Sequence, residues 1–252
     1  MLKNEADNFC MSWIKRSQKK GAIRRFATVL LPDHLLVQLK FELYMLFVRT
    51  RSRHTHLSYR GKHNLLLNIG AGDTGRDGWV NIDGLKVKGV NCNYDARKRL
   101  PFPDGSVKGI FTEHFLEHLD YTEEVPSFLA ECYRVLKEGG IIRIIIPDAG
   151  KYIKAYVQDG WQEIAAVRQL RDDVRDPYFH YDYNTKMELI NVIFRQEQEH
   201  KFAYDFETIE LLLKRHGFNE VTKREFRQSA NPELSIDSEG RAAESLYVEA
   251  KK

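Results

Sequence analysis

The sequence predicts an α/β fold built around a parallel sheet, with helices covering both of its faces. From Leu65 onward, short apolar runs alternate with segments of helical periodicity, which is the pattern of such a sheet. The first apolar run breaks into Gly-x-Gly at Gly70 to Gly72, and the second run ends in a carboxylate at Asp83. A glycine turn can present backbone N–H groups, and a carboxylate can bind a ribose diol. We therefore expect a nucleotide-type cofactor at the carboxyl edge of the sheet.

Seven apolar runs have the length of strands. We expect strands at residues 65–69, 79–83, 89–94, 107–112, 140–146, 219–226 and 245–250. Helices are expected at residues 123–137 and 205–216. The second of these helices begins at Asp205 and ends at Gly217. Residues 148–200 are expected to form an insertion of two or three helices, and residues 229–244 a loop. The main domain would then span residues 63–252.

The composition is that of an ordinary globular protein, with 42% hydrophobic and 30% charged residues. Its three cysteines, Cys10, Cys92 and Cys132, are an odd number without metal-ligand spacing, which argues against a disulfide framework. No residue is assigned to a metal ion. The N-terminus carries acidic residues and lacks the apolar segment of a signal peptide, so we expect a cytoplasmic protein.

The N-terminal extension, residues 1–62, is strongly basic. It holds thirteen Lys/Arg against four Asp/Glu, whereas the rest of the chain carries a net negative charge. Residues 12–31 have the periodicity of a basic amphipathic helix that ends before Pro32, and Asp33 would cap a second helix. The apolar part of this second helix, residues 35–48, is shorter than the roughly 20 residues that cross a bilayer.

Two interpretations of this extension remain open. Residues 12–62 could contact anionic lipid at the inner face of the membrane, or another polyanion, because basic side chains alternate with bulky apolar ones. Alternatively, they form a helical hairpin packed on the main domain with solvated charges. A nucleic-acid partner is not expected, because the main domain is acidic and no base-handling motif or RNA-binding module is present.

Four motifs follow the glycine turn in a fixed order. Gly-Trp-Val-Asn-Ile-Asp occupies residues 78–83, and Asn-Tyr-Asp-Ala occupies residues 93–96. Glu-His-Phe-Leu-Glu-His-Leu follows at residues 113–119, and an Ile-rich run after Glu-Gly-Gly ends in Pro-Asp at residues 138–148. Each motif alone is a weak signal, whereas the ordered set is specific.

With these motifs, the chain resembles the class I S-adenosylmethionine-dependent methyltransferases, in particular the type 11 bacterial group that is often associated with cell-surface polysaccharide biosynthesis. The resemblance is close over residues 64–148 and looser over residues 200–250. It implies a Rossmann-like, mostly parallel seven-stranded sheet with an antiparallel last strand, preceded by a helical N-terminal extension. It also implies S-adenosyl-L-methionine as the cofactor, and O-methylation of a sugar or surface-glycan precursor as the reaction.

The resemblance further implies a set of cofactor-binding residues near the strand ends. These are Gly70, Ala71, Gly72, Asp73, Asp83, Asp95, Ala96 and Glu113. The glycine turn with the region of Asp73 would contact the methionine part of the cofactor. Asp83 would bind the ribose, Asp95 with Ala96 the adenine, and Glu113 would lie near the sulfonium.

One feature departs from the family pattern. Only residues 73–78 separate the glycine turn from the second strand, whereas a parallel crossover with its helix needs at least about 10–12 residues. The first crossover helix must therefore be missing or reduced to a turn. This is compatible with a cofactor that carries no phosphate, because backbone groups can hold its amino-acid end.

Methyl transfer from a sulfonium is an in-line displacement, so catalysis depends on holding the acceptor close to the methyl group. A hydroxyl acceptor also needs a base. His114 is the first candidate, followed by His118, Asp148 and His200. For His118 and His200 a purely structural role is equally open. Acceptor specificity is expected from the aromatic and arginine residues of the insertion, namely Tyr152, Tyr156, Trp161, Arg168 and Arg171.

Two alternatives come from other classes of protein. Residues 114–118 match H-x-x-E-H, the inverted zinc-peptidase motif, in which two histidines on one helical face bind zinc. An inactive cofactor-binding scaffold, tethered by its basic extension, would carry the same series of glycine and acid motifs.

Overall fold

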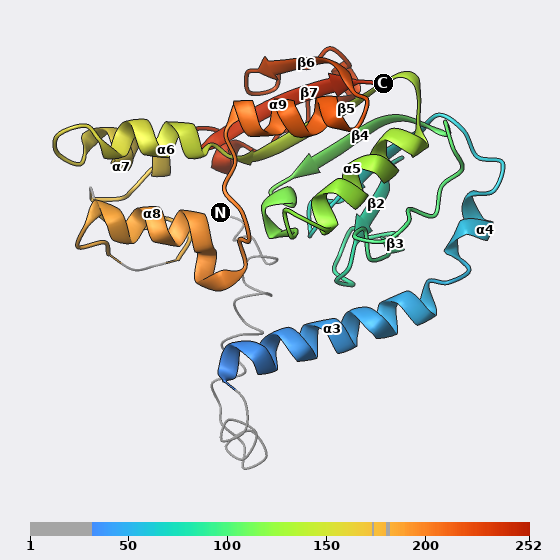
Figure 1. The fold of residues 1–252 in the computed structure, drawn as a ribbon, viewed down its shortest axis with the longest axis horizontal. Helices are drawn as coiled ribbons and strands as arrows, with labels where there is room; N and C mark the ends of the chain where they lie inside the picture. The colour runs from blue at the N-terminus through green and yellow to red at the C-terminus, as the bar shows by residue number, and fades with distance from the viewer. Residues whose placement is uncertain (1–31, 173, 180–181) are drawn as a thin grey trace.

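The computed structural model describes residues 32–172, 174–179 and 182–252, so the helix expected at residues 12–31 lies outside the described residues. Seven strands form one sheet: β1 (Leu65–Ile69), β2 (Val80–Asp83), β3 (Cys92–Asn93), β4 (Val107–Glu113), β5 (Leu136–Pro147), β6 (Asn219–Arg224) and β7 (Ser245–Lys251). Their order is β3-β2-β1-β4-β5-β7-β6 (Figure 1). β7 runs antiparallel to both of its neighbours, β5 and β6, while β1 to β5 pair in parallel. The predicted seven-stranded, mostly parallel fold is confirmed.

The helices lie before the first strand and between later strands. The α-helices are α3 (Asp33–Arg51), α4 (Thr55–Tyr59), α5 (Glu124–Val135), α6 (Ala149–Tyr156), α7 (Gln162–Arg168), α8 (Lys186–Arg195) and α9 (Phe206–Arg215). Short 3-10 turns are η1 (Leu116–His118), η2 (Gln196–Gln198), η3 (Pro232–Leu234) and η4 (Glu239–Arg241). Asp205 caps α9 as expected, its side chain accepting a hydrogen bond from Thr208 N. Asp33 does not cap its helix; it is the first residue of α3, after Pro32.

The two faces of the sheet are covered differently. α5 and α9 lie on one face (Figure 1), where Phe128 and Leu213 join the core cluster that contains Leu67. On the other face Leu66 packs in a cluster with Leu234 of the loop 229–244. Leu234 is the last residue of η3, so a short 3-10 turn within this loop contributes to the apolar cover of the second face.

A buried arginine fastens that loop to the sheet. Arg143 of β5 is 0% exposed, and its Nε and Nη2 donate to Asp237 at 2.8 and 2.5 Å. Its Nη1 donates to Glu249 of β7 at 3.1 Å. A buried cation needs such paired acceptors, because an isolated charge is costly to desolvate. The loop and the central strands are thus joined through one charged cluster.

The connection between β1 and β2 contains no helix, as its length predicted. Asn81 of β2 stabilises this short crossover from within the sheet. Its side-chain oxygen accepts from Arg76 N and its amide nitrogen donates to the Arg76 carbonyl, both at 2.9 Å. One side chain therefore satisfies backbone groups that a crossover helix would otherwise have paired.

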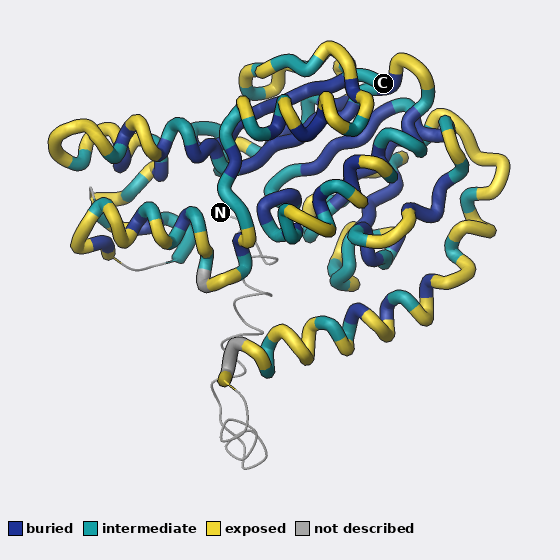
Figure 2. The backbone as a smooth tube through the Cα atoms, in the orientation of Figure 1, coloured by how far each residue is buried: buried dark blue, intermediate teal, exposed yellow. Residues whose placement is uncertain are grey.

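The helical insertion contains three helices, α6 to α8, in agreement with the sequence. It has its own apolar cluster of buried residues, which are Tyr152, Ala155, Ile164, Tyr183, Leu189 and Ile193. The N-terminal helix α3 is attached more sparsely. Met45 and Val48 are buried against the domain, while most of its length is exposed (Figure 2).

Candidate active site

The glycine turn, the end of β2 and the end of β4 meet at the carboxyl edge of the sheet. Gly70 and Gly72 adopt φ values of 73° and 50°, in the left-handed region that glycine tolerates best. A Cβ atom on Gly70 would lie 2.8 Å from Cβ of Phe115, which follows β4. The glycine therefore permits a close approach between the β1 turn and η1.

The backbone N–H groups of this turn are paired inside the protein. Gly70 N and Ala71 N both donate to the Ile82 carbonyl at 3.0 Å, and Gly72 N donates to Oδ2 of Asp83 at 2.9 Å. The expectation that these groups point at a ligand is therefore wrong. The short crossover folds the turn back onto β2, and the Ala71 carbonyl accepts from Thr74 N and Thr74 Oγ1 within it. The carbonyl oxygens of Gly70 and Gly72 are the groups of this turn that could meet a ligand.

Asp83 ends β2 with unused hydrogen-bonding capacity. Its Oδ2 accepts from Gly72 N, and its Oδ1 accepts from Leu85 N at 2.7 Å. A carboxylate offers about four acceptor sites, so about two remain for the hydroxyls of a ribose. Burial raises the pKa of Asp83, while the hydrogen bonds from Leu85 and Gly72 and the charge of His118 act to lower it. The carboxylate therefore keeps the acceptor capacity that a ribose would need, and its ribose role stays a prediction.

Asp95 is engaged far more completely. It is 2% exposed, and its Oδ1 accepts from Arg97 N at 3.1 Å and Arg97 Nε at 2.9 Å. Its Oδ2 accepts from Arg49 Nε at 2.7 Å and from Arg97 Nη2 at 3.1 Å. Burial acts to raise the pKa of Asp95, but the two arginines outweigh it and lower the pKa. Four hydrogen bonds fill the acceptor sites of the carboxylate, which leaves none for the adenine amine.

Arg49 reaches Asp95 from α3, and sequence reasoning missed this contact. The same helix provides Glu42, which accepts from Arg97 Nη1 at 2.5 Å and from Arg49 Nη2 at 3.2 Å. Met45 packs beside Gly84, immediately after Asp83. The extension therefore contacts the predicted adenine residue Asp95 directly and packs next to Gly84, the neighbour of the predicted ribose residue. Its charge pattern had indicated only a basic surface.

Glu113, at the end of β4, holds the loop that covers the second face of the sheet. Its Oε1 accepts from Ser238 N at 3.0 Å, and its Oε2 accepts from Ser238 Oγ at 2.6 Å. Both carboxylate oxygens of Glu113 therefore already accept a hydrogen bond within the protein.

His114, the first candidate base, follows β4 with φ of 50°. Its Nδ1 lies 3.1 Å from Oε1 of Glu117, and its Nε2 lies 3.1 Å from Oγ of Ser245. A carboxylate only accepts, so Nδ1 donates to Glu117. Both ring nitrogens are thus engaged within the protein, and neither presents a free lone pair to a substrate.

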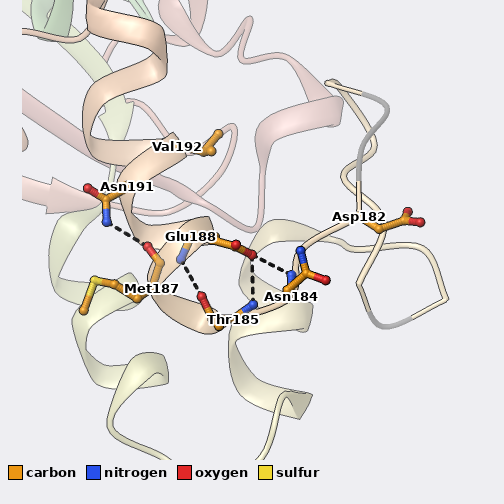
Figure 3. A pocket seen from close by; sticks show the side chains of 7 residues that line it. All are labelled: Asp182, Asn184, Thr185, Met187, Glu188, Asn191 and Val192. Carbon is orange, nitrogen blue, oxygen red and sulfur yellow. Dashed lines mark hydrogen bonds between the residues drawn. The ribbon is translucent and has the colours of Figure 1, made fainter.

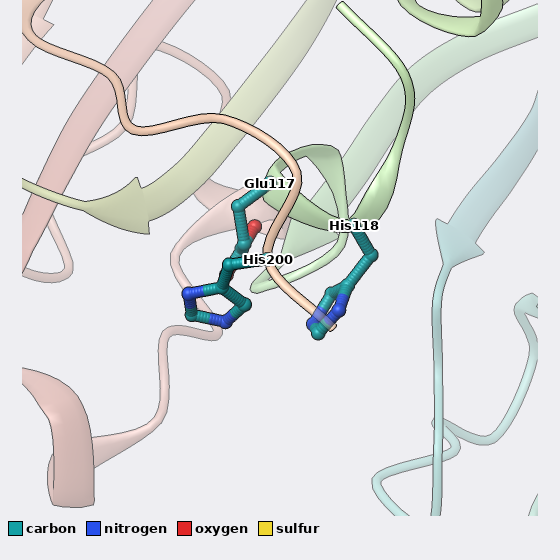
Figure 4. Close-up of side chains that lie close together, drawn as sticks. All are labelled: Glu117, His118 and His200. Atoms are coloured by element: carbon teal, nitrogen blue, oxygen red, sulfur yellow. The ribbon is translucent and has the colours of Figure 1, made fainter. Parts of the chain in front are cut away.

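The structure brings His118 and His200 together, with ring centroids 4.8 Å apart (Figure 4). Nδ1 of His118 lies 3.2 Å from the Glu199 carbonyl, and Nδ1 of His200 lies 2.6 Å from the Ile193 carbonyl. Carbonyls only accept, so each Nδ1 carries a proton, and a ring that holds no second proton keeps its lone pair on Nε2. Burial lowers the pKa of His200 to about 4.

Glu117 lies between the three histidines and is 1% exposed. Burial acts to raise its pKa, but the hydrogen bond from His114 and the charges of the three histidines outweigh it and lower the pKa to about 2. The repeated Glu-His pairs of residues 113–118 were the only sequence signal for this arrangement. Because His200 belongs to a distant segment of the chain, that motif could not predict the cluster.

Two residues expected to choose the acceptor are instead internal supports of the insertion. Arg168 is 2% exposed and pairs with Asp176 at 2.9 Å and Glu244 at 2.6 Å. Tyr152 is fully buried and donates to Glu244 at 2.5 Å. The structure also has an open groove of about 560 Å³ at the start of α8, lined by Thr185 and Asn191 among others (Figure 3). This groove contains none of the motif residues.

Residues 80–144 match the sequence model of a family described as a methyltransferase domain. That stretch contains β2 to β4, α5 and most of β5, including Asp83 and the histidine turn. Together with the strand order, the match defines the class: the protein is an S-adenosylmethionine-dependent methyltransferase, with S-adenosylmethionine as the methyl donor. No match was found among curated proteins.

Several solved structures are similar to this chain. A SAM-dependent methyltransferase from Archaeoglobus fulgidus is 22% identical, with a TM-score of 0.47, over 87% of this chain and 100% of that chain. A possible histamine N-methyltransferase from Thermotoga maritima is 17% identical, with a TM-score of 0.42, over 84% and 95% of the two chains. Phosphoethanolamine N-methyltransferase 2 from Haemonchus contortus, in complex with S-adenosyl-L-methionine, is 15% identical, with a TM-score of 0.41, over 79% and 52%.

The zinc-hydrolase alternative is not favoured by the geometry of its motif. Residues 116–118 form a 3-10 turn, and the pair that the motif requires, His114 and His118, does not share a helical face. Nε2 of His114 is directed at Ser245, and Nδ1 of His118 at Glu199.

Proposed function

We propose that the protein transfers the methyl group of S-adenosylmethionine to a hydroxyl oxygen of a sugar or surface-glycan precursor. The observation that carries this proposal is that Asp83 and His118 lie at the same edge of the sheet, at the end of β2 and in the turn after β4. Asp83 keeps acceptor sites for a ribose, and His118 has its Nδ1 on a backbone carbonyl with its Nε2 open. A hydroxyl must lose a proton during methylation, so a neutral imidazole beside the cofactor suits this acceptor. The sugar class rests on the family resemblance alone.

The proposed cofactor site follows the strand ends. The carbonyl oxygens of Gly70 and Gly72, with Asp73, would hold the ammonium of the methionine part, because the N–H groups of the turn are already paired. Ala71 would lie beside the methionine part, since its carbonyl already accepts from Thr74 N and Thr74 Oγ1. Asp83 would bind the ribose. Adenine would lie beside Ala96. Asp95 could accept a hydrogen bond from adenine only if Arg49 or Arg97 moved away from its carboxylate. We place Glu113 as a support of the loop near the sulfonium.

Among the four candidate bases, we assign the proton transfer to His118. Asp148 instead caps α6, its Oδ1 accepting from Lys151 N at 3.1 Å. Its Nδ1–H is oriented by the Glu199 carbonyl, which leaves Nε2 as the acceptor. His114 is held by Glu117 and Ser245. His200 is 8% exposed. Its contact with the His118 ring supports a positioning role.

Replacing His118 by glutamine is expected to lower turnover by roughly 10²–10⁴-fold, the usual contribution of a general base. The affinity for S-adenosylhomocysteine should change little, because the side chain is assigned to the acceptor. Turnover is measured as S-adenosylhomocysteine formed with a panel of nucleotide-activated sugars, using metal-stripped protein, and affinity is measured by calorimetry.

The matched control is His216→Gln. His216 also has its Nδ1 on a backbone carbonyl, Leu212 O at 2.7 Å, but it lies at the end of α9. This variant should keep wild-type turnover. If His118→Gln also retained wild-type turnover, His118 would lose the role of base. If no sugar supported turnover in the wild-type protein, the acceptor class would be wrong.

We further propose that α3 contacts an anionic membrane surface. Its exposed apolar side chains are Leu35, Leu39, Phe41, Leu43, Leu46 and Phe47. Arg51 is exposed in its last turn, whereas Arg49 of the same turn is paired with Asp95 and Glu42. An apolar patch beside basic residues suits the interface of an anionic bilayer. Within the described part of the chain, no helix is long and apolar enough to cross that bilayer.

The double variant Leu43→Glu, Phe47→Glu is expected to weaken binding to vesicles of phosphatidylglycerol and phosphatidylcholine by at least roughly tenfold, because both side chains leave the apolar interface. Both residues are 58% exposed, so the fold should not change. Cosedimentation measures the binding. Leu211→Glu, at a residue of α9 that is 45% exposed, is the control and should bind as the wild type does. Equal binding of all three proteins would rule out α3 as the contact.

A further inference from the structure

Glu117, His118 and His200 form a compact group at the junction of two segments. Their potential ligand atoms lie within 4.8 Å of one another (Figure 4). Glu117 and His118 belong to η1, whereas His200 lies in the segment that leads into α9. Lys201 N donates to the Glu117 carbonyl at 2.8 Å, which keeps the two segments side by side. The group is therefore assembled by the tertiary fold.

Both imidazoles are oriented in the manner of metal ligands. A ligating histidine almost always donates its second ring N–H to a carbonyl or carboxylate, which fixes the tautomer and aims the lone pair at the ion. His118 and His200 each make this bond through Nδ1, to the carbonyls of Glu199 and Ile193. Both Nε2 atoms are thus available to an ion.

The carboxylate of Glu117 supplies the matching anionic group. Its Oε1 accepts from His114, but its buried Oε2 has no hydrogen-bond partner among the described residues. A buried unpaired carboxylate oxygen is costly, and an ion or a water molecule would relieve that cost. The hydroxyl of Tyr204 is also buried without a described partner. Glu117, His200 and Tyr204, but not His118, line a cavity of about 10 Å³ beside this group, which has room for about a single small occupant.

We propose that Glu117, His118 and His200 bind one divalent transition-metal ion of the zinc class. Two imidazoles and one carboxylate are a common ligand set for zinc in proteins. Ligand atoms around zinc lie roughly 3.4 Å apart, so binding draws these side chains together by at most about 1.4 Å. The ion ties η1 to the segment before α9 and neutralises the buried carboxylate.

This metal site goes beyond the proposed function, but both use the same atom, Nε2 of His118. A lone pair serves one partner at a time, so an ion on Nε2 of His118 prevents that nitrogen from accepting the proton of the acceptor. Zinc is therefore expected to lower methyl transfer in proportion to its occupancy. Metal binding itself does not depend on whether the protein methylates a sugar.

The test uses the full chain, stripped with a chelator and titrated with zinc chloride by calorimetry. Wild-type protein should bind one zinc ion per chain, and its melting temperature should rise by about 5 °C at a free zinc concentration 100 times Kd. Glu117→Gln and His200→Ala should each weaken this binding by at least roughly 100-fold, because each removes a direct ligand. Titration with cobalt chloride should give the visible absorption of a four-coordinate site in the wild type, but not in Glu117→Gln or His200→Ala.

His56→Ala is the matched control, because His54 and His56 form an exposed pair whose rings lie 6.5 Å apart and could bind zinc adventitiously. The control should bind zinc as the wild type does. Loss of binding in His56→Ala, retention in Glu117→Gln and His200→Ala, or no saturable binding in the wild type would each overturn the proposal. If a variant failed to fold, the cobalt spectrum of the wild-type protein would still test the proposal, because absence of four-coordinate absorption would contradict it. Binding of S-adenosylhomocysteine, measured separately, distinguishes failure of this site from failure of the proposed function.

Discussion

Replacing Asp83 by alanine is expected to weaken S-adenosylmethionine binding by roughly 100-fold or more. A ribose diol would donate two hydrogen bonds to this carboxylate, and bonds to a charged acceptor each contribute about 1.5–3 kcal/mol. Their loss corresponds to at least about 3 kcal/mol, which exceeds a factor of 100 in Kd. Isothermal titration calorimetry with S-adenosylmethionine measures the change.

The same substitution also affects the fold, because Asp83 accepts hydrogen bonds from Gly72 N and Leu85 N. Leaving these donors unpaired costs about 1–3 kcal/mol each where they stay buried. Asp83→Asn keeps the shape and one acceptor oxygen, so a thermal melt of both variants separates stability from binding. Asp77→Asn, at an exposed position of the same crossover, is the control and should bind normally. Wild-type affinity in a folded Asp83→Ala protein would remove Asp83 from the ribose site.

The second large effect is expected for Arg143→Met, which should lower the free energy of unfolding by about 3–5 kcal/mol. Methionine fills much of the volume but leaves Asp237 and Glu249 without their shared cation. The cost of an unpaired buried charge then falls mainly on Asp237, because Glu249 keeps its ion pair with Arg224 at 3.0 Å. Such a loss is a large fraction of the 5–15 kcal/mol typical of a folded domain. Urea denaturation followed by circular dichroism measures it.

A surface pair provides the control for this prediction. Lys214 is 60% exposed and contacts Glu210 at 2.8 Å on α9, so Lys214→Met should cost less than about 1 kcal/mol. Adding Asp237→Asn and Glu249→Gln to Arg143→Met should restore part of the stability, because the unpaired charges disappear. An Arg143→Met protein as stable as the Lys214→Met protein would contradict the buried-cluster account.

Much of the fold could be predicted from periodicity. Apolar runs located all seven strands, and the residue count between Gly72 and Trp79 predicted the missing crossover helix. Asp205 and Gly217 marked the ends of α9. β3 is shorter than expected, in part because the side chain of Asn91 accepts from Asn81 N in place of a further ladder bond. Local patterns succeed where each residue responds to its own neighbours along the chain.

The candidate site was only partly predictable, because its partners come from distant segments. Asp83 kept its expected environment, whereas the partner of Asp95 proved to be Arg49 on α3. His200 was a candidate base, but nothing in its local sequence placed it beside His118 and Glu117. A motif specifies which chemical groups follow a strand. It does not specify which residues from distant segments will form hydrogen bonds or ion pairs with those groups.

Local patterns along the chain were therefore enough to predict the strand pattern, the short crossover and the acid at the end of β2, whereas the class of enzyme was predicted from the resemblance of the ordered motifs. These depend on spacing along the chain and on backbone preferences that act locally. The tertiary structure decided that the N–H groups of the glycine turn face inward, that Arg143 holds a loop against the sheet, and that two histidines meet at Glu117. These outcomes depend on closing long loops so that buried polar groups find partners, and no local pattern records that pairing.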